Sequence, residues 1–335
     1  MTRRLLVVSP GFHGYHASIA RAFEELGYDV ATFAYDAAGS TGEKVWNKVR
    51  HELPGVLGST GQHHSGETAS RRALAALRHF HPDRVLVVRG DVLSEEFWAE
   101  ASAHGRPVIV WMYDEMRRTA FEPGMVAPYA RMATYSARDA AALTAAGLET
   151  RHVSLGFDAG ASSSPTSLGS GCVSFVGAPS PARQNALSSL IRAGIPVGAW
   201  GRGWSDQYFD RARTWRLSSR RVPAGRDLAG PVAHAVMRNS LATLNIHGDQ
   251  DGFTMRTFES CGVGAVQLVD RSDVSDFYEP SQEVLVYQGE EELLDIARRV
   301  LSKPQEFAGM RERAHRRTMA EHTLGHRARV LAGMW

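Results

Sequence analysis

The stretch CVSFVGAPSPARQNALSSLIRAGIPVGAWGRG, residues 172–203, shows most clearly how the chain folds. An apolar run, VSFV, precedes a stretch of helical length, and a second apolar run, PVGAW, follows it. Apolar runs without strict alternation are typical of strands that are covered on both faces. A helix between two such strands makes a β-α-β unit, so this stretch predicts a parallel sheet with helices packed on it.

The same alternation extends in both directions along the chain. Strand-like runs separated by amphipathic helical stretches occupy residues 5–158 and resume at residue 172, after which a helical tail follows. Residues 159–171, AGASSSPTSLGSG, are small and turn-forming, which predicts a linker. We therefore expect an α/β protein of two doubly wound, Rossmann-like domains, 1–158 and 172–315, that face a central cleft.

Composition excludes several classes of function. The chain has 335 residues, a formal net charge of +2 and two cysteines, Cys172 and Cys261, that are far apart. Such a charge gives no global attraction to nucleic acid or anionic membrane, and two distant cysteines form neither a disulfide framework nor a zinc ribbon. No apolar run reaches the roughly 18 residues that a membrane helix needs. We expect a cytoplasmic protein without a membrane span.

The stretch GDQDGFTMRTFESCG, residues 248–262, predicts a ligand site. It joins an apolar strand, residues 241–248, to a helix, and open α/β sheets bind ligands at the carboxyl ends of their strands. Free amides from Thr254 onward favour a phosphate, and Gly252 lets the backbone approach a ligand closely. Glu259 in the helix can accept two hydrogen bonds from a ribose diol. Together these features predict a site for a nucleoside diphosphate.

Two other interpretations of this stretch stay open. Asp249 and Asp251 form an Asp-x-Asp pair that could hold Mg²⁺ together with a diphosphate. The acidic loop could instead cap the helix start and bind nothing. Asp-x-Asp often arises by chance, and sugar transferases that use it as a metal site usually have one mixed-sheet domain. We therefore favour the prediction that this site binds no metal ion.

The longer spacing, from Asp251 to Glu259, carries a family resemblance. DGFTMRTFESCGVGAVQL, residues 251–268, resembles the signature of retaining GT-B glycosyltransferases of group 1, in which seven residues separate two acids. Arg256, Phe258 and Glu259 are most similar to the spore maturation protein (CgeB-like) branch. The family usually has Glu where this chain has Asp251, so the shorter side chain reaches less far. Further matching pieces are WMYDE (111–115), LGFD (155–158), FVGAPSPAR (175–183), AWGRGW (199–204) and EHTLGHR (321–327).

The resemblance implies a GT-B fold and a glycosyltransferase, hexosyl or pentosyl, that uses a nucleotide-diphosphate sugar. It further implies retention of anomeric configuration, no metal and no other cofactor. The domain 172–315 would bind the donor, the domain 1–158 would bind the acceptor, and residues 316–335 would pack back on the first domain. The acceptor is a small molecule, a glycan or, through the basic run 211–221, a nucleic acid. Alternatives are a nucleotide-sugar epimerase or hydrolase on this fold, and a non-catalytic protein that binds sugar nucleotides.

Roles for individual residues follow from the resemblance. Glu259 would hold the ribose, and Asp251 would lie near the transferred sugar. Asp114 would act as acceptor base or hold sugar hydroxyls, and His13 would contact the sugar or the acceptor. The remaining candidates for donor binding are Gly177, Arg183, Arg202, Gly252, Phe253, Thr254 and Arg256.

Each candidate has a structural alternative. Arg183 could be a solvated residue at a helix start, Arg256 could pair with Asp249 or Asp251, and Asp114 could cap a helix. A lone histidine such as His13 more often has a structural role. The aromatic residues that could stack on a nucleobase or else belong to the core are Trp200, Trp204, Tyr208 and Trp215.

Two histidines near the C-terminus have the spacing of a zinc pair. His322 and His326 lie four residues apart in a predicted helix. The Glu of the zinc motif H-E-x-x-H is missing here. We therefore expect these two histidines to be structural.

Overall fold

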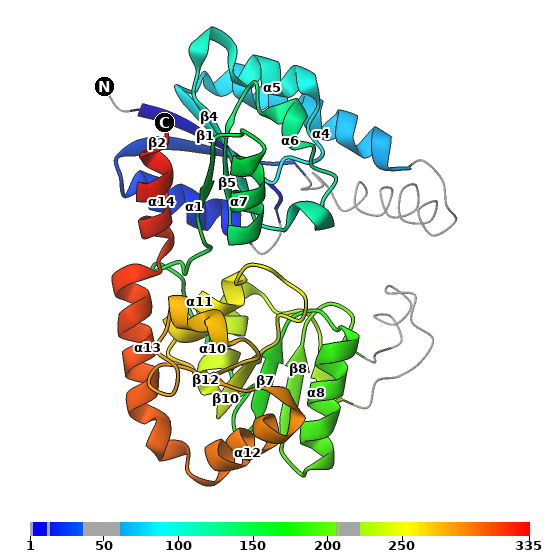
Figure 1. Ribbon diagram of the computed structural model, residues 1–335, viewed down its shortest axis with the longest axis vertical. Coiled ribbons are helices and arrows are strands. Elements are labelled where there is room, and N and C mark those ends of the chain that lie inside the picture. The colour runs from blue at the N-terminus through cyan, green and yellow to red at the C-terminus, as the bar shows by residue number, and fades with distance from the viewer. Residues whose placement is uncertain (1–2, 12–13, 36–60, 206, 208–221) are drawn as a thin grey trace. The chain divides into compact units, whose positions relative to one another are not determined.

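The computed structural model describes residues 3–11, 14–35, 61–205, 207 and 222–335, which form two compact units. Unit 1 contains Met1–Ser154 and Leu324–Trp335, and unit 2 contains Leu155–Thr323 (Figure 1). The sequence places domain boundaries near residues 158 and 316, whereas the structure divides the chain after residues 154 and 323. The helix expected around residues 43–53 lies outside the described residues.

Unit 1 is built on a parallel sheet of six strands in the order β2-β1-β3-β4-β5-β6. The strand β4 reads VIVWM and is buried along its whole length, as expected for a strand that helices cover on both faces. The elements are β1 (Arg3–Ser9), α1 (Tyr15–Glu24), β2 (Tyr28–Ala34), α4 (Gly61–Phe80), β3 (Arg84–Val88), α5 (Glu95–Ala101), η3 (Ala103–Gly105), β4 (Val108–Met112), η4 (Met116–Arg118), α6 (Pro123–Val126), β5 (Arg131–Thr134), α7 (Ala137–Ala145), β6 (Thr150–His152) and α14 (Leu324–Ala332).

Unit 2 contains a second parallel sheet of six strands, in the order β12-β11-β10-β7-β8-β9. Counted within the unit, this is the 3-2-1-4-5-6 order of the doubly wound fold, which reverses between β7 and β10. The elements are β7 (Val173–Val176), α8 (Pro181–Arg192), β8 (Val197–Trp200), β9 (Ala224–Gly225), α10 (Gly230–Asn239), β10 (Ala242–Asn245), α11 (Met255–Gly262), β11 (Gln267–Val269), η5 (Ser272–Asp276), β12 (Leu285–Val286), α12 (Gly289–Ser302), η6 (Pro304–Phe307) and α13 (Ala308–Glu321).

The predicted linker, residues 159–171, is hydrogen-bonded to α10. Ser164 donates its amide to the carbonyl of Pro231 at 3.0 Å, and Asn239 donates its side-chain amide to Thr166 at 2.7 Å. Gly169 has φ +85°, and a Cβ there would lie 2.6 Å from the carbonyl oxygen of Val236. Small residues allow this close approach, so the stretch packs as part of unit 2.

The helix α11 ends at Gly262, as the pattern of residues 254–262 predicts. Gly262, expected to stop the helix, is its last residue, and Gly264 with φ +72° follows the cap. A Cβ at Gly262 would lie 2.4 Å from the Phe157 ring, so this glycine serves packing. Ala265 donates its amide to Ser260 at 2.9 Å, which closes the last turn. Residues 264–266 therefore belong to the turn that follows α11. As a result β11, Gln267–Val269, is shorter than the strand that the apolar run GAVQLVD, residues 264–270, predicts.

Only the last helix of the C-terminal tail belongs to unit 1. α14 packs against α1, whereas α13 packs against α11 within unit 2. His322, at the end of α13, is buried and donates or accepts a hydrogen bond at 2.8 Å with the carbonyl of Phe277. Its ring lies 5.1 Å from Tyr278 and 5.7 Å from Phe258, centre to centre. These contacts agree with the structural role expected for His322.

Candidate functional site

The strand order of unit 2 reverses between β7 and β10, which are neighbours in the sheet. The loops that follow two such strands lead away from each other and leave a crevice at the carboxyl ends of the strands. Doubly wound folds bind their ligands in this crevice. Most of the residues predicted to bind a donor belong to these loops or to the helix that follows them. Gly177 and Arg183 follow β7, and Asp251, Gly252, Phe253, Thr254, Arg256 and Glu259 follow β10.

Arg183 connects the two loops across this edge. It lies in the first turn of α8, where the Ser180 hydroxyl accepts its amide N–H. Its Nη2 donates to the carbonyl of Ile246 at 3.0 Å, and its Nη1 donates to Ala178 at 2.9 Å. The guanidinium carbon also lies 5.4 Å from the centre of the Phe175 ring. Arg183 is therefore half-buried and fixed in place, unlike a solvated arginine at a helix start.

The loop after β7 packs closely on the turn after β8. Gly177 donates its amide to Trp200 at 2.8 Å, and its carbonyl accepts the indole N–H of Trp204 at 2.6 Å. Gly201 has φ +150°, and a Cβ there would lie only 2.3 Å from the Gly177 carbonyl oxygen. The neighbouring Arg202 is exposed. Gly177 is thus held at the switch point, and Arg202 lies in the turn that follows β8.

Trp204 belongs to the core, because its side chain is fully buried against Phe175. Trp200 is half-buried and packs against Gly198 and Gly225. The interpretation of Trp204 as a base-stacking residue is therefore wrong. Tyr208, Trp215 and the basic run 211–221 lie outside the described residues.

A buried carboxylate occupies the middle of α11. Glu259 is 4% exposed, and its Oε2 accepts a hydrogen bond from Nη1 of Arg256 at 2.6 Å. Its Oε1 lies 3.7 Å from Nε2 of His234 on α10, which is also buried. This ion pair between Arg256 and Glu259 was not predicted from the sequence. Three functional groups therefore converge on one buried point, a positively charged arginine, a carboxylate and an imidazole.

The loop between β10 and α11 turns its carbonyl groups toward Arg271. Nη1 of Arg271 donates to Gln250 at 2.7 Å, and Nη2 donates to the carbonyl of Asp251 at 2.9 Å. Within the part of the chain that the structure describes, the amides of Gly252, Phe253 and Thr254 have no hydrogen-bond partner. Thr254 also gives α11 no side-chain cap. Unpartnered amides at a helix start are a favourable place for an anion.

A buried polar network holds the other side of this loop. The backbone N–H of His247 donates to both oxygens of Asp270 at 3.0 Å, and its Nδ1 lies 2.9 Å from Oδ1. Nε2 of His247 meets the hydroxyl of Thr257 on α11 at 3.0 Å, and Asn245 donates to that hydroxyl at 2.9 Å. The network thus ties β10, β11 and the first turns of α11 together.

The carboxyl of Asp270 keeps its charge inside this network. Burial raises its pKa, but hydrogen bonds from the side chain and the amide of His247 and from the amide of Gly248 lower it more. The net effect is a pKa below the ordinary 3.8. The sequence analysis missed His247, Asp270 and Arg271. The available signal was their place at strand ends, since Asp270 and Arg271 directly follow an apolar run.

Unit 1 has its own charged cluster at the carboxyl ends of β3 and β4. Asp114 follows β4, and its Oδ2 lies 3.2 Å from Nη1 of Arg89, which also pairs with Asp91 at 2.9 Å. Arg89 has φ +64°, a conformation that non-glycine residues seldom adopt and that is often found at functional sites. His13, the other residue predicted for this edge, lies outside the described residues.

The environment of Asp114 favours its neutral form. Burial raises its pKa above the ordinary 3.8, while the positive charge of Arg89 lowers it. The negative charges of Glu115 and Asp91 raise it again, and the balance is a raised pKa. A carboxylate with a raised pKa is a stronger base than an ordinary aspartate, which suits a group that accepts a proton.

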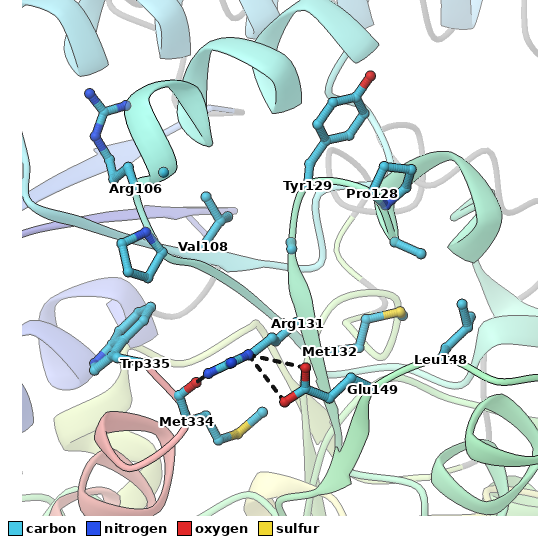
Figure 2. A pocket seen from close by; sticks show the side chains of 14 residues that line it. Arg106, Val108, Pro128, Tyr129, Arg131, Met132, Leu148, Glu149, Met334 and Trp335 are labelled. Atoms are coloured by element: carbon cyan, nitrogen blue, oxygen red, sulfur yellow. Dashed lines mark hydrogen bonds and ion pairs between the residues drawn. The ribbon is translucent and has the colours of Figure 1, made fainter.

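A cavity of about 360 Å³ lies at the amino ends of β4 and β5 in the unit 1 sheet. Figure 2 shows it beside the first residues of β4 and β5, lined by Val108, Met132 and Trp335 among others. Arg131 pairs with Glu149 at 3.1 Å in its wall and also donates to the carbonyl of Met334. Ligands of open α/β sheets bind at the carboxyl ends of the strands, so we do not place the main site here.

Residues 3–11, 14–35, 61–205, 207 and 222–335 contain no group of three or more His, Cys, Asp and Glu side chains suited to a metal ion. None of the helices in these same ranges is both long and apolar enough to cross a membrane.

Solved structures with the same architecture include a sucrose-phosphate synthase, a protein in complex with UDP and an epimerase. Sucrose-phosphate synthase from Thermosynechococcus elongatus matches with a TM-score of 0.64 at 11% identity, over 99% of this chain and 98% of that one. Anabaena HepE in complex with UDP matches with a TM-score of 0.62 at 14% identity, over 99% of each chain. A UDP-N-acetylglucosamine 2-epimerase matches with a TM-score of 0.56 at 13% identity, over 93% and 91% of the two chains. Similarity at such low identity shows the fold alone.

The two Rossmann-like units therefore have the GT-B fold. Residues 183–333 match the family model described as glycosyl transferase-like, which covers the site in unit 2. No curated protein sequence matches the chain.

Proposed function

We propose that the protein transfers a sugar from a nucleotide-diphosphate sugar to an acceptor. The observation that supports this proposal is that several groups suited to a nucleotide diphosphate meet at the switch point of unit 2. Arg183 bridges the loops after β7 and β10, and the start of α11 presents unpartnered amides beside the buried pair of Arg256 and Glu259. Amides and arginines suit a diphosphate, and a fixed carboxylate suits a ribose diol. The match of residues 183–333 to a glycosyl transferase-like family supports the same conclusion.

In this proposal the bond between the anomeric carbon and the diphosphate oxygen breaks. The departing diphosphate gains negative charge, which Arg183, Arg256 and the amides of Gly252 to Thr254 stabilise. The acceptor oxygen bonds to the anomeric carbon and loses its proton. We propose Asp114 as the base that takes this proton, and Asp251 as the group nearest the transferred sugar. Retention of configuration is part of the proposal and rests on the resemblance of residues 251–268 alone.

A ligand screen tests the activity directly. We expect a nucleoside diphosphate and its matching nucleotide sugar to raise the melting temperature, because they bind the folded form only. Mass spectrometry with candidate acceptors should then detect a glycosylated product, and NMR of its anomeric proton should show retained configuration. Turnover should be unchanged in EDTA, because the proposed site uses arginines and amides in place of a metal.

Other results of the screen identify the alternatives. Conversion of the nucleotide sugar without an acceptor would indicate an epimerase or a hydrolase, as in one structural neighbour. Binding without turnover would indicate a sugar-nucleotide-binding protein. A chain that binds no nucleoside diphosphate and no nucleotide sugar would overturn the proposal altogether.

Replacing Arg89 by methionine tests the role of Asp114. The positive charge of Arg89 lowers the pKa of Asp114, so its removal should raise that pKa further. A base works only when deprotonated, and its activity is lost as the pH falls through its pKa. The acidic limb of kcat/KM against pH should therefore move to higher pH in Arg89→Met.

The matched control for this test is Arg78→Met, which removes an exposed arginine paired with Glu100 in the same unit. Its acidic limb should stay where it is in the unchanged protein. If Arg89→Met also left the limb in place, Asp114 would not be the base.

A further inference from the structure

Arg271 shapes the loop that follows β10 through contacts with three consecutive carbonyl groups. Besides the bonds to Gln250 and Asp251, its Nη1 lies 3.4 Å from the carbonyl oxygen of Gly252. Its guanidinium carbon lies 4.2 Å from the centre of the Phe253 ring. A guanidinium is a rigid, planar fork of donors, so it can hold several acceptors in one fixed arrangement.

The orientation of the carbonyls fixes the orientation of the amides. In a planar trans peptide the C=O of one residue and the N–H of the next point in opposite directions. Carbonyls 250, 251 and 252 point to Arg271, so the N–H groups of Asp251, Gly252 and Phe253 point away from it. Successive N–H groups on one side of a loop form a concave site for an anion.

The charge of Arg271 is already engaged by a carboxylate, that of Asp273. Its Nε donates to Oδ1 of Asp273 at 2.9 Å, and its Nη2 donates to Oδ2 of the same residue. This pairing fixes the plane of the guanidinium and offsets its charge. Arg271 therefore suits the task of orienting the loop better than that of attracting a phosphate as a free cation.

We propose that Arg271 is a positioning residue for the diphosphate of the donor. It aligns the amides of Gly252 and Phe253 into an anion-binding loop and touches no ligand itself. The inference rests on the proposed function, since it assumes that a nucleoside diphosphate binds beside α11. It adds a residue from beyond β11 to a site whose other members lie on the loops after β7 and β10 and on α11.

Calorimetry with Arg271→Lys and Arg271→Met tests the inference. The probes are UDP, GDP and ADP, of which the best ligand of the unchanged protein is used, and the corresponding nucleoside. Lysine keeps the charge but lacks the rigid planar fork that spans the loop carbonyls and Asp273 together, so both variants should bind the diphosphate about tenfold to a hundredfold more weakly. Their affinity for the nucleoside should change by less than about threefold, because the loop amides contact only the phosphates.

Arg311→Lys is the matched control. Arg311 lies on α13 and likewise binds backbone carbonyls, those of Arg238 at 2.8 Å and of Leu241 at 3.2 Å, before β10 begins. This variant should lose a comparable set of hydrogen bonds and keep its affinity for the diphosphate. A general loss of structure would lower nucleoside and diphosphate binding alike, or lower the fraction of active protein, and would overturn the positioning role.

Three results separate this inference from the proposed function. If the unchanged protein binds none of the diphosphates, the proposed function fails and the inference with it. If the unchanged protein binds and both Arg271 variants bind equally well, only the inference fails. If Arg271→Lys binds normally and Arg271→Met does not, the charge acts directly on the phosphate and the positioning role is wrong.

Discussion

Replacing Glu259 by alanine is expected to lower kcat/KM for the donor by about a hundredfold or more. Two charge-assisted hydrogen bonds to a ribose diol contribute about 1.5–3 kcal/mol each, and each 1.4 kcal/mol corresponds to a factor of about ten. The substitution also removes the carboxylate that holds Arg256 at 2.6 Å, so that arginine would lose its fixed position beside the diphosphate. Steady-state kinetics with varied donor concentration measure the effect, and most of it should appear as a higher KM.

Two further variants separate the roles of this carboxylate. Glu259→Gln keeps one acceptor oxygen but loses the charge, so we expect an intermediate loss. Glu306→Ala removes a glutamate of the same unit that is paired with Arg299 and Lys303 far along the chain, and should leave the kinetics unchanged. A Glu259→Ala protein with full turnover and an unchanged donor KM would refute the proposed site.

Replacing Asp270 by alanine is expected to lower the free energy of unfolding by about 3 kcal/mol. The substitution leaves the amides of His247 and Gly248 and the buried imidazole of His247 without their acceptor. Each buried donor without a partner costs about 1–3 kcal/mol, so the loss of this shared acceptor accounts for the expected difference. Urea unfolding at pH 7, followed by circular dichroism, measures the difference.

The pH dependence of this difference has a definite sign. The pKa of Asp270 is lowered below 3.8 in the folded protein, so its stabilisation is fully present above that value. It is lost as the pH falls through the lowered pKa, and the gap between the variant and the unchanged protein should close there. Asp295→Ala, which removes an exposed partner of Arg298, should cost less than about 1 kcal/mol at any pH. An equally small cost for Asp270→Ala would show that the network does not stabilise unit 2.

Local sequence patterns were sufficient for the fold class and for the loop and helix start that form the candidate site in unit 2. Buried strands such as VIVWM and the intervening amphipathic helices predicted two doubly wound units, and both sheets are parallel. The spacing from Asp251 to Glu259 predicted a loop and a helix start, which are present. These features are local, because they depend on hydrophobic periodicity and on residues within two or three turns of one another.

Contacts between distant segments were not predicted from the sequence. Arg271, for example, donates to the carbonyls of Gln250 and Asp251, which lie 21 and 20 positions before it in the chain. The stretch 159–171 has the composition of a linker, but it packs on α10. Ser164 donates its amide to the carbonyl of Pro231, and Asn239 of α10 donates to the carbonyl of Thr166. A segment of small polar residues is flexible only if no other part of the chain binds its backbone groups. The composition of the segment does not show whether such a partner lies beside it in the fold.

The sequence by itself determined which segments become strands and helices and which residues follow each strand. Only the tertiary structure decided which of those residues meet. Arg183 reaches Ile246 because β7 and β10 are neighbours in the sheet, although 63 residues separate the two in the chain. Arg271 reaches the carbonyls of 250–252 because β11 lies beside β10. Strand order depends on how whole helices pack on the sheet, so no local pattern around Arg271 indicates the loop that it holds.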